Sequence, residues 1–248
     1  MAKNILIISS DYNQFFIKPI LFHLKNHFKN LEVYISEEKK IKKIKRYFYM
    51  LLMFNFYELS KVLIRLIKFF NSKKKYDYDH KLVRDINDKQ FIDEINNKKF
   101  DLIVFFNCAQ ILKKDAIERL LSDTLNFHPG ILSQHRGLFP IFYAILKKEK
   151  FIGFTLHRVE RKIDSGKIFN EIKLPIEEKD GFFSLHQKLY SNNDVLDFIK
   201  TSIEDYGNFK KEIEKKPQLS SYLSFPSFYQ IIEYKILRFS KLFKKINK

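Results

Sequence analysis

Hydrophobic and polar positions follow two kinds of pattern along this chain. Short apolar runs bounded by polar residues predict strands at 4–9, 31–36, 101–107, 124–129, 152–159 and 168–176. Apolar residues at helical spacing predict helices at 15–28, 91–98, 115–121, 140–150 and over most of 181–206. Strands that alternate with helices are typical of an α/β fold with a mostly parallel, doubly wound sheet. The last two strands follow one another without a helix, which predicts an antiparallel excursion.

Three segments depart from this alternation. Residues 39–72 predict one long or two shorter helices, and the polar stretch 74–90 predicts a loop. The stretch PQLSSYLSFPSFYQ, beyond Gly207, is rich in Ser, Pro and aromatic residues. It is too short for a second domain of ordinary size. We therefore expect a main domain at 1–206 and a small C-terminal appendage at 207–248.

The net charge of +17 is confined to two segments. Residues 39–75 hold twelve Lys or Arg against one acid, residues 235–248 hold six against none, and the remainder is neutral. Aromatic and aliphatic residues interleave with these cations, so three explanations stay open: an amphipathic surface for anionic lipid, a rim that attracts phosphate, or a solvated helix face. The longest apolar run, 47–57, is much shorter than the roughly 20 residues that span a membrane.

Other features limit the compartment and the chemistry. One cysteine, Cys108, excludes an intrachain disulfide and a cysteine-based zinc site. The apolar run at 4–9 is too short for the core of a signal peptide, so we expect a cytoplasmic protein. The sequence contains no G-x-G-x-x-G, Walker or G-x-S-x-G motif, so we expect no dinucleotide and no nucleophilic serine. His128, His135 and His157 lack the i, i+4 spacing that would place two of them on one helix face, so we expect no metal.

The segment NFHPGILSQHRGLFP, residues 126–140, concentrates polar and turn-forming residues. Asn126 and His128 are two residues apart on a strand that ends at Pro129, so both side chains leave one face at the carboxyl edge. An amide and an imidazole there can stabilise an oxyanion and accept a proton from an amine. Asp164, in a turn with Ser165 and Gly166, is the carboxylate that would support the imidazolium. Each residue also has an ordinary structural explanation: turn former, buried imidazole, Asx turn.

Five motifs in this order resemble the folate-dependent formyltransferases: Asn126-x-His128-Pro129, then Arg136-Gly137 with Pro140, Gly153-x-Thr155-x-His157, Asp164-x-Gly166-x-Ile168 and Leu174-Pro175-Ile176. The resemblance covers residues 100–190 strongly and the first strand loosely. It implies a Rossmann-like domain that transfers a formyl group from N10-formyltetrahydrofolate to a primary amine. Two positions depart from the family pattern, Leu132-Ser133 and His135, and both concern the substrate side.

The resemblance also implies residue roles. Asn126, His128 and Asp164 would be catalytic. The cofactor would contact the turn after the 101–107 strand and the loop before the aspartate, at Phe106, Gln110, Ile111, Leu112, Glu160 and Ile163. For the substrate we expect the end of the first strand, the motif arginine and the tail aromatics: Ser10, Asp11, Tyr12, Asn13, Arg136, Tyr222, Phe225 and Tyr229. Hydroxyl and amide groups would hold phosphate or hydroxyl oxygens, and aromatic rings would stack on a base.

The amine acceptor is inferred from what the sequence lacks. SSDYNQFF, after the first strand, is not the phosphate loop of the glycinamide ribonucleotide enzymes, and about forty residues after 206 are too few for the C-terminal barrel of the initiator-tRNA enzymes. We expect a small-molecule partner, a nucleotide-linked amino-deoxysugar such as a dTDP-4-amino-4,6-dideoxyhexose used for surface polysaccharide or O-antigen, and no nucleic acid. A homodimer and a peripheral membrane contact stay open. The alternative is a protein of this fold that acts on another amine, or binds RNA or anionic membrane through its basic segments.

Overall fold

The computed structural model describes residues 3–11, 14–54, 58–60, 64, 78–211 and 220–246. Its centre is a sheet of seven strands in the order β3-β2-β1-β4-β5-β7-β8. In chain order the strands are β1 Ile5–Ser10, β2 Leu31–Ser36, β3 Lys81–Val83, β4 Leu102–Phe106, β5 Asp123–His128, β6 Arg136–Gly137, β7 Phe151–Arg158, β8 Ile168–Pro175 and β9 Tyr222–Leu223. β6 and β9 form a separate two-stranded sheet.

The pairing confirms the predicted fold class. β1, β2, β3, β4 and β5 are parallel to their neighbours, whereas β7 runs antiparallel to both β5 and β8. The excursion begins where β5 ends, because β7 returns along β5 and sets His128 opposite Thr155 and Asn126 opposite His157. Parallel strands bring their carboxyl ends to one edge, and this edge is where open α/β sheets bind ligands.

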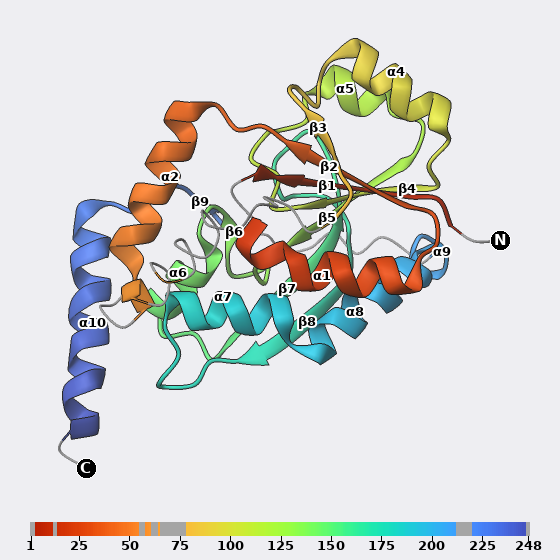
Figure 1. The fold of residues 1–248 in the computed structure, drawn as a ribbon. Coiled ribbons are helices and arrows are strands. Elements are labelled where there is room, and N and C mark those ends of the chain that lie inside the picture. Colours follow the sequence, from red (N-terminus) through yellow and green to blue (C-terminus); the bar gives the residue numbers. More distant parts are fainter. Residues whose placement is uncertain are drawn as a thin grey trace.

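Helices cover both faces of the sheet. They are α1 Gln14–His27, α2 Lys40–Met53, α4 Lys89–Lys98, α5 Lys114–Arg119, α6 Pro140–Leu146, α7 Phe182–Ser191, α8 Asn193–Glu204, α9 Tyr206–Phe209 and α10 Phe228–Ile246. Figure 1 shows α4 and α5 on one side and α1, α7 and α8 on the other. Alternate residues of β1 point to opposite faces, so Ile5 and Ile7 join the larger core while Leu6 and Ile8 join the smaller core under α4 and α5.

The structure corrects one of the sequence predictions and decides between the alternatives of another. The stretch 74–90, predicted as a loop, contains the edge strand β3 at 81–83 and the first two residues of α4. Only Val83 of that strand is buried, so no apolar pattern marks it. In the segment 39–72, α2 ends at Met53 and residues 58–60 are helical. The rest of that prediction falls mainly on 55–57, 61–63 and 65–72, which lie outside the described residues.

The C-terminal segment packs against the body of the protein. β9 pairs in parallel with β6, and α10 contacts both α6 and α2. Tyr234 and Ile231 of α10 belong to the larger core, where the Tyr234 ring lies 5.1 Å from that of Phe142. Residues beyond 206 therefore contribute buried surface to the main domain.

Candidate active site

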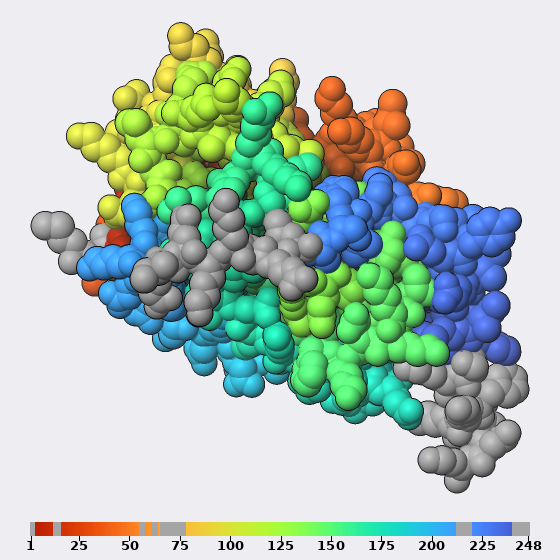
Figure 2. Space-filling view, turned by 180° about the vertical axis from the view of Figure 1, so that it is seen from behind, coloured from red at the N-terminus to blue at the C-terminus, as the bar shows by residue number. Residues whose placement is uncertain are grey.

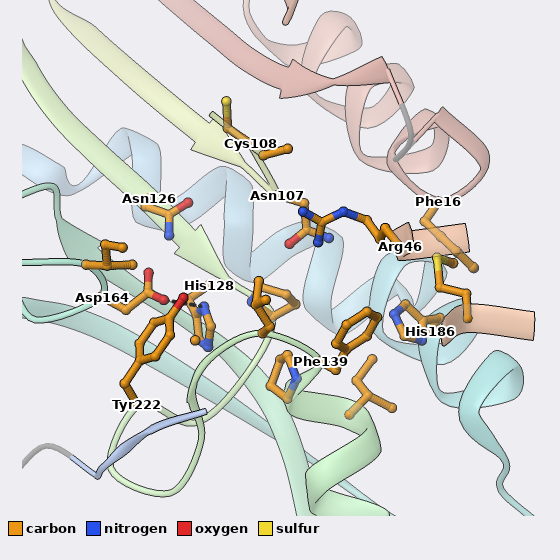
Figure 3. Close-up of a pocket in the computed structure, with 18 of the residues that line it drawn as sticks. Phe16, Arg46, Asn107, Cys108, Asn126, His128, Phe139, Asp164, His186 and Tyr222 are labelled. Carbon is orange, nitrogen blue, oxygen red and sulfur yellow. Dashed lines mark ion pairs between the residues drawn. The ribbon is translucent and has the colours of Figure 1, made fainter. Parts of the chain in front are cut away.

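Three polar side chains meet at the carboxyl edge of the sheet, beside one pocket. Asn126 and His128 come from β5, and Asp164 comes from the connection between β7 and β8. All three line the pocket, with the turn after β4 on one side and the C-terminal segment on the other. Figure 3 shows the three side chains facing the same space. The structure thus assembles the three residues that the motifs predicted to act together.

His128 is buried, and both of its ring nitrogens have neighbours. Nε2 lies 2.8 Å from the carbonyl oxygen of His135. A carbonyl only accepts hydrogen bonds, so Nε2 carries a proton and donates it. Nδ1 lies 3.6 Å from Oδ2 of Asp164, an ion-pair distance rather than a close hydrogen bond. Nδ1 is therefore the nitrogen that can exchange a proton at the pocket, with the carboxylate beside it to stabilise the positive charge.

Asn126 is oriented by a second histidine, His157 on β7. Nδ1 of His157 donates to the carbonyl of Arg158 at 2.8 Å, and its Nε2 lies 3.0 Å from Nδ2 of Asn126. Burial lowers the pKa of His157 to about 4, although Asp164 opposes that shift. The ring is therefore neutral near pH 7, so Nε2 accepts from the Asn126 amide. This contact uses one amide hydrogen and leaves the second for the pocket.

Asp164 adopts a left-handed backbone conformation, with φ of 49°. Aspartate tolerates this region better than most residues because its short polar side chain bonds locally. Its Oδ1 lies 3.6 Å from Nε2 of His157, so one carboxylate faces both histidines. Two residues later, a Cβ on Gly166 would lie 2.1 Å from the carbonyl oxygen of Arg158. Only glycine fits there, and this close approach holds the turn that presents Asp164.

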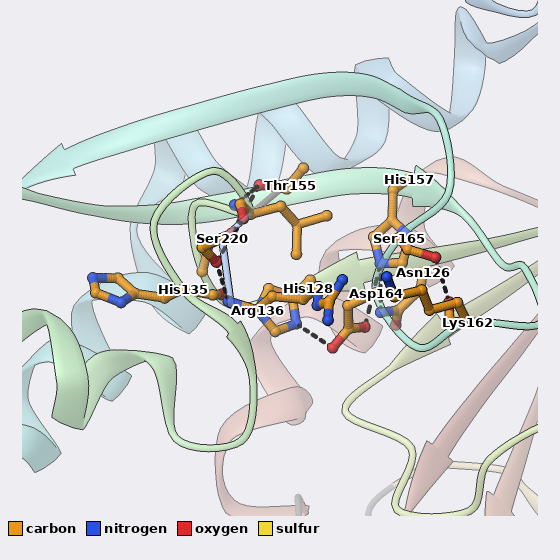
Figure 4. Close-up of polar contacts among 12 residues, drawn as sticks. Asn126, His128, His135, Arg136, Thr155, His157, Lys162, Asp164, Ser165 and Ser220 are labelled. Atoms are coloured by element: carbon orange, nitrogen blue, oxygen red, sulfur yellow. Dashed lines mark hydrogen bonds and ion pairs between the residues drawn. The ribbon is translucent and has the colours of Figure 1, made fainter. Parts of the chain in front are cut away.

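The loop after His128 is fastened to β7. Thr155 Oγ1 donates to the Gly130 carbonyl at 2.7 Å and accepts from the Leu132 amide at 3.4 Å (Figure 4). A Cβ on Gly130 would lie 2.7 Å from Cβ of Pro140 and 3.0 Å from Nε2 of His128. The glycine is therefore required by the close packing between the loop and the histidine ring. The motif residue Thr155, together with Gly130, acts on the shape of the site rather than on a ligand.

The residues predicted to bind the cofactor divide into two groups. Ile111 and Ile163 line the pocket. The other four lie elsewhere: Phe106 stacks on Phe127 in the core, Leu112 packs in the smaller core, and Gln110 bonds the backbone of Ile86, Glu37 and Arg84. Glu160 is exposed and does not line the pocket. The side chains of these four residues thus pack in the protein or face solvent. Of the six residues predicted to bind the cofactor, only the two isoleucines present apolar side chains to the pocket.

The residues predicted to bind substrate are more widely scattered. Tyr222 lines the pocket, and Figure 3 shows its phenol oxygen turned toward His128 and Asp164. Phe225 packs on Tyr49 and Phe139 with ring centres 5.0 and 5.5 Å away, and Tyr229 is 83% exposed. Arg136 is buried, and its guanidinium carbon lies 5.8 Å from the centre of the Tyr222 ring. Ser10 bonds Ser36 and the Ala109 amide, and Asp11 pairs with Lys43. Tyr12 and Asn13 lie outside the described residues.

Several pocket residues escaped the sequence analysis. They come from α1, α2, the turn after β4, the α6 start and α7: Phe16, Arg46, Met50, Asn107, Phe139, Phe182 and His186. Arg46 pairs with buried Glu38, with Nη2 and Oε1 3.1 Å apart. Nothing in its local sequence separates Arg46 from the neighbouring surface lysines. Asn107 and Phe139, with φ of 47° and 52°, hold left-handed positions that the sequence does not announce.

The sequence profile of the formyl transferase family matches residues 62–196, more than half of the 248 residues. The chain belongs to the formyl transferase family. Its sequence is 35% identical over 159 residues to the bifunctional polymyxin resistance protein ArnA of Wigglesworthia glossinidia brevipalpis, covering 62% of this chain and 24% of ArnA. It is 30% identical over 126 residues to the methionyl-tRNA formyltransferase of Finegoldia magna, covering 51% and 40%. The chain thus spans less than half the length of these relatives.

Solved structures share the fold at lower identity. WlaRD, a sugar 3N-formyl transferase solved in the presence of dTDP and 5-N-formyl-THF, aligns with a TM-score of 0.55 and 22% identity over 96% of this chain and 80% of its own. A sugar N-formyltransferase from Shewanella sp. FDAARGOS_354 aligns with a TM-score of 0.52 and 20% identity over 90% and 74%. These formyl transferase structures have the same architecture as the sheet and helices described above.

Among the described residues, no group of three or more His, Cys, Asp or Glu side chains is arranged to hold a metal ion. Over the same residues, no helix combines the length and apolar character of a membrane span.

Proposed function

We propose that this protein is a cytoplasmic enzyme that transfers a formyl group from N10-formyltetrahydrofolate to the amine of a nucleotide-linked amino-deoxysugar, such as a dTDP-4-amino-4,6-dideoxyhexose used for surface polysaccharide. The observation that carries the proposal is the convergence of Asn126, His128 and Asp164 on one pocket. Family membership supports the formyl transfer. The sugar N-formyltransferases among the structural relatives support the class of acceptor.

The pocket has the features that a formyl donor requires. The Asn126 amide donor and the His128 imidazole stand at one end, and the apolar side chains of Ile111 and Ile163 stand on its wall. Bound N10-formyltetrahydrofolate would supply an activated formyl carbon to an attacking amine. Donors aimed at the carbonyl oxygen stabilise the negative charge that develops during that attack. The residues present therefore fit this group.

The roles of the residues follow from their hydrogen bonds. Asn126 directs its second amide hydrogen into the pocket, because His157 accepts the first. Nε2 of His128 is committed to the His135 carbonyl, so Nδ1 takes the proton that the amine releases. Asp164 holds the imidazolium by charge and relays the proton, which would go to N10 of the leaving tetrahydrofolate as the bond between N10 and the formyl carbon breaks. Tyr222 and Arg46 approach the same pocket from the C-terminal segment and from α2, and we assign them to the substrate side.

A substrate panel tests the proposal. Purified protein is incubated with N10-formyltetrahydrofolate and, separately, with amino-sugar nucleotides, glycinamide ribonucleotide or methionyl initiator tRNA. We expect formyl transfer to an amino-sugar nucleotide, and none when Asn126 and His128 are both replaced by alanine. The tRNA arm is essential because methionyl-tRNA formyltransferases are among the sequence relatives. Transfer to tRNA alone would overturn the sugar assignment and keep the chemistry. Transfer to no amine at all would overturn both.

A further inference from the structure

Helix α2 has two functional faces. Arg46 and Met50 point into the pocket. At 100° per residue, the opposite side of the helix carries an apolar stripe at spacings of three and four residues: Ile41, Ile44, Phe48 and Leu51. These four side chains are between 47% exposed, at Leu51, and 83% exposed, at Ile41. An outward apolar stripe on a helix whose inner face is already packed has no role in folding the domain.

Helix α10 repeats this arrangement. Tyr234 and Ile231 are buried in the core. The outer side carries a second stripe with the same spacing: Tyr229, Ile232, Ile236 and Phe239. These side chains are between 41% exposed, at Ile232, and 83% exposed, at Tyr229. Exposed apolar residues are ordinary singly, but two periodic stripes mark an interaction surface.

The two helices lie together at one edge of the molecule. Figure 1 shows α2 and α10 at the side of the sheet, and Figure 2 shows them adjacent in the view from behind. α10 contacts α2, and the Lys235 ammonium donates to the Phe54 carbonyl at the end of α2. We call the two stripes, with the exposed Lys40 and Lys45 that flank the stripe of α2, the docking edge.

Charge identifies what the docking edge binds. α2 contains five Lys or Arg and no acid, and Lys40, Lys42 and Lys45 are exposed, as is Lys39 just before it. α10 contains five Lys or Arg and one acid, Glu233. α2 lies within the basic segment 39–75 and the second half of α10 within the basic segment 235–248, and these two segments hold the entire net charge of +17. The docking edge is therefore apolar along its two stripes and positive beside the stripe of α2.

We propose that the docking edge binds reversibly to an anionic lipid bilayer. Apolar side chains enter the boundary between headgroups and acyl chains, while lysines beside them attract anionic headgroups. A second copy of the chain is a poorer occupant, since the pairing of two such edges sets lysines against lysines. RNA is poorer because its phosphates need cations at the centre of the contact, where α2 and α10 present isoleucines, a leucine and aromatic rings.

Vesicle sedimentation of the full chain tests this inference. Vesicles of equal parts phosphatidylcholine and phosphatidylglycerol are compared with pure phosphatidylcholine vesicles. We expect binding to the anionic vesicles only, weakened by added salt. Lys40→Gln with Lys45→Gln, at the two exposed lysines that flank the stripe, should weaken it about twenty-five-fold, at about fivefold per lysine. Ile44→Ser with Ile236→Ser should also weaken it, since both side chains leave the acyl boundary.

Matched controls locate the effect. Two control variants should bind vesicles like the unaltered protein. The first is Phe22→Ser, at a 72% exposed position on α1, and the second is Lys89→Gln with Lys113→Gln, on the side of α4 and α5. Unchanged melting temperatures and formyl transfer in solution show that the variants fold. No binding to anionic vesicles, or equal loss in the controls, would overturn the inference. If sedimentation velocity shows a dimer, and Ile44→Ser with Ile236→Ser dissociates it, the docking edge binds a second copy of the chain instead. If the protein binds RNA and the lysine variant does not, the docking edge binds RNA instead.

Discussion

The pocket has two sides that are built differently. On the sheet side, Asn126, His128 and Asp164 lie within residues 126–164. The His135 carbonyl bonds His128, the His157 ring bonds Asn126, and Thr155 fastens the loop that follows His128. On the outer side, Arg46, Phe139 and Tyr222 come from three distant segments that meet through aromatic and cation–π packing. Hydrogen bonds require particular directions between donor and acceptor, whereas packed rings tolerate several relative orientations. The sheet side therefore suits fixed chemistry, and the outer side suits a substrate that differs among relatives.

The largest expected effect is on the sheet side. His128→Ala should lower kcat by a factor of at least about 100, because a positioned proton acceptor is lost. Asn126→Ala should cost a similar factor through the lost oxyanion donor. If the residues act as one unit, the double variant is no worse than the worse single variant, as steady-state kinetics would show. If the factor lost in kcat by the double variant equals the product of the two single factors, Asn126 and His128 act independently. Full activity in Asp164→Asn would remove Asp164 from the mechanism.

The second prediction concerns the histidine behind Asn126. The pKa of His157 is lowered to about 4 by burial, so between pH 6.5 and about 4 the unfolded chain binds the extra proton and the folded chain does not. The stability that neutral His157 contributes is therefore present above pH 6.5 and is lost as the pH falls. The free energy of unfolding should fall by about 2 kcal/mol from this residue between pH 7 and pH 5.

Urea titrations at the two pH values measure that loss. His135 and His186, whose pKa values are also lowered to about 4 by burial, add to the same slope. His157→Gln keeps an acceptor for Asn126 and removes one titrating ring. The free energy of unfolding should therefore fall less steeply between pH 7 and pH 5, with the contributions of His135 and His186 remaining. An unchanged slope would mean that His157 is solvated in the folded protein.

The third prediction sharpens the description of the outer side. Tyr222→Ala should raise KM for the amine acceptor about tenfold, about 1.4 kcal/mol, with a smaller change in KM for the formyl donor. Tyr222 packs against Gly137, whose Cα faces the ring so closely that a Cβ would lie 2.8 Å from Cε2. Tyr229→Ala is the matched control, because Tyr229 is exposed and outside the pocket. The same KM change in both variants would remove Tyr222 from the substrate wall.

The smallest effect is expected at Phe225. This ring packs on Tyr49 and Phe139, and the Lys45 ammonium lies 4.4 Å from its centre. Phe225→Leu should lower the free energy of unfolding by about 1 kcal/mol, through lost ring contacts, and change KM less than about threefold. Thermal unfolding and kinetics on one preparation give both values. A large KM change with unaltered stability would mean that the ring contacts substrate.

Several features of this protein follow from sequence alone. The apolar runs predicted as strands at 4–9, 101–107 and 124–129 form β1, β4 and β5 to within one residue at each end, because a buried strand needs a continuous or alternating apolar pattern. The strand period of two and the stop at Pro129 place Asn126 and His128 together on the pocket side of the sheet edge. The order of the five motifs indicated the family that the sequence profile shows.

Tertiary structure decided the rest. β3 is short and exposed, and β6 and β9 are two residues each, so their pairing depends on neighbours rather than on local pattern. Arg46 looks like any other cation of α2 until the helix packs over the sheet edge. The sequence predicted that the Tyr222 ring stacks on a base. Tyr222 reaches the catalytic cluster only because β9 pairs with Arg136-Gly137. Local sequence determines periodicity and turn chemistry, whereas contacts between distant segments depend on which buried faces fit together.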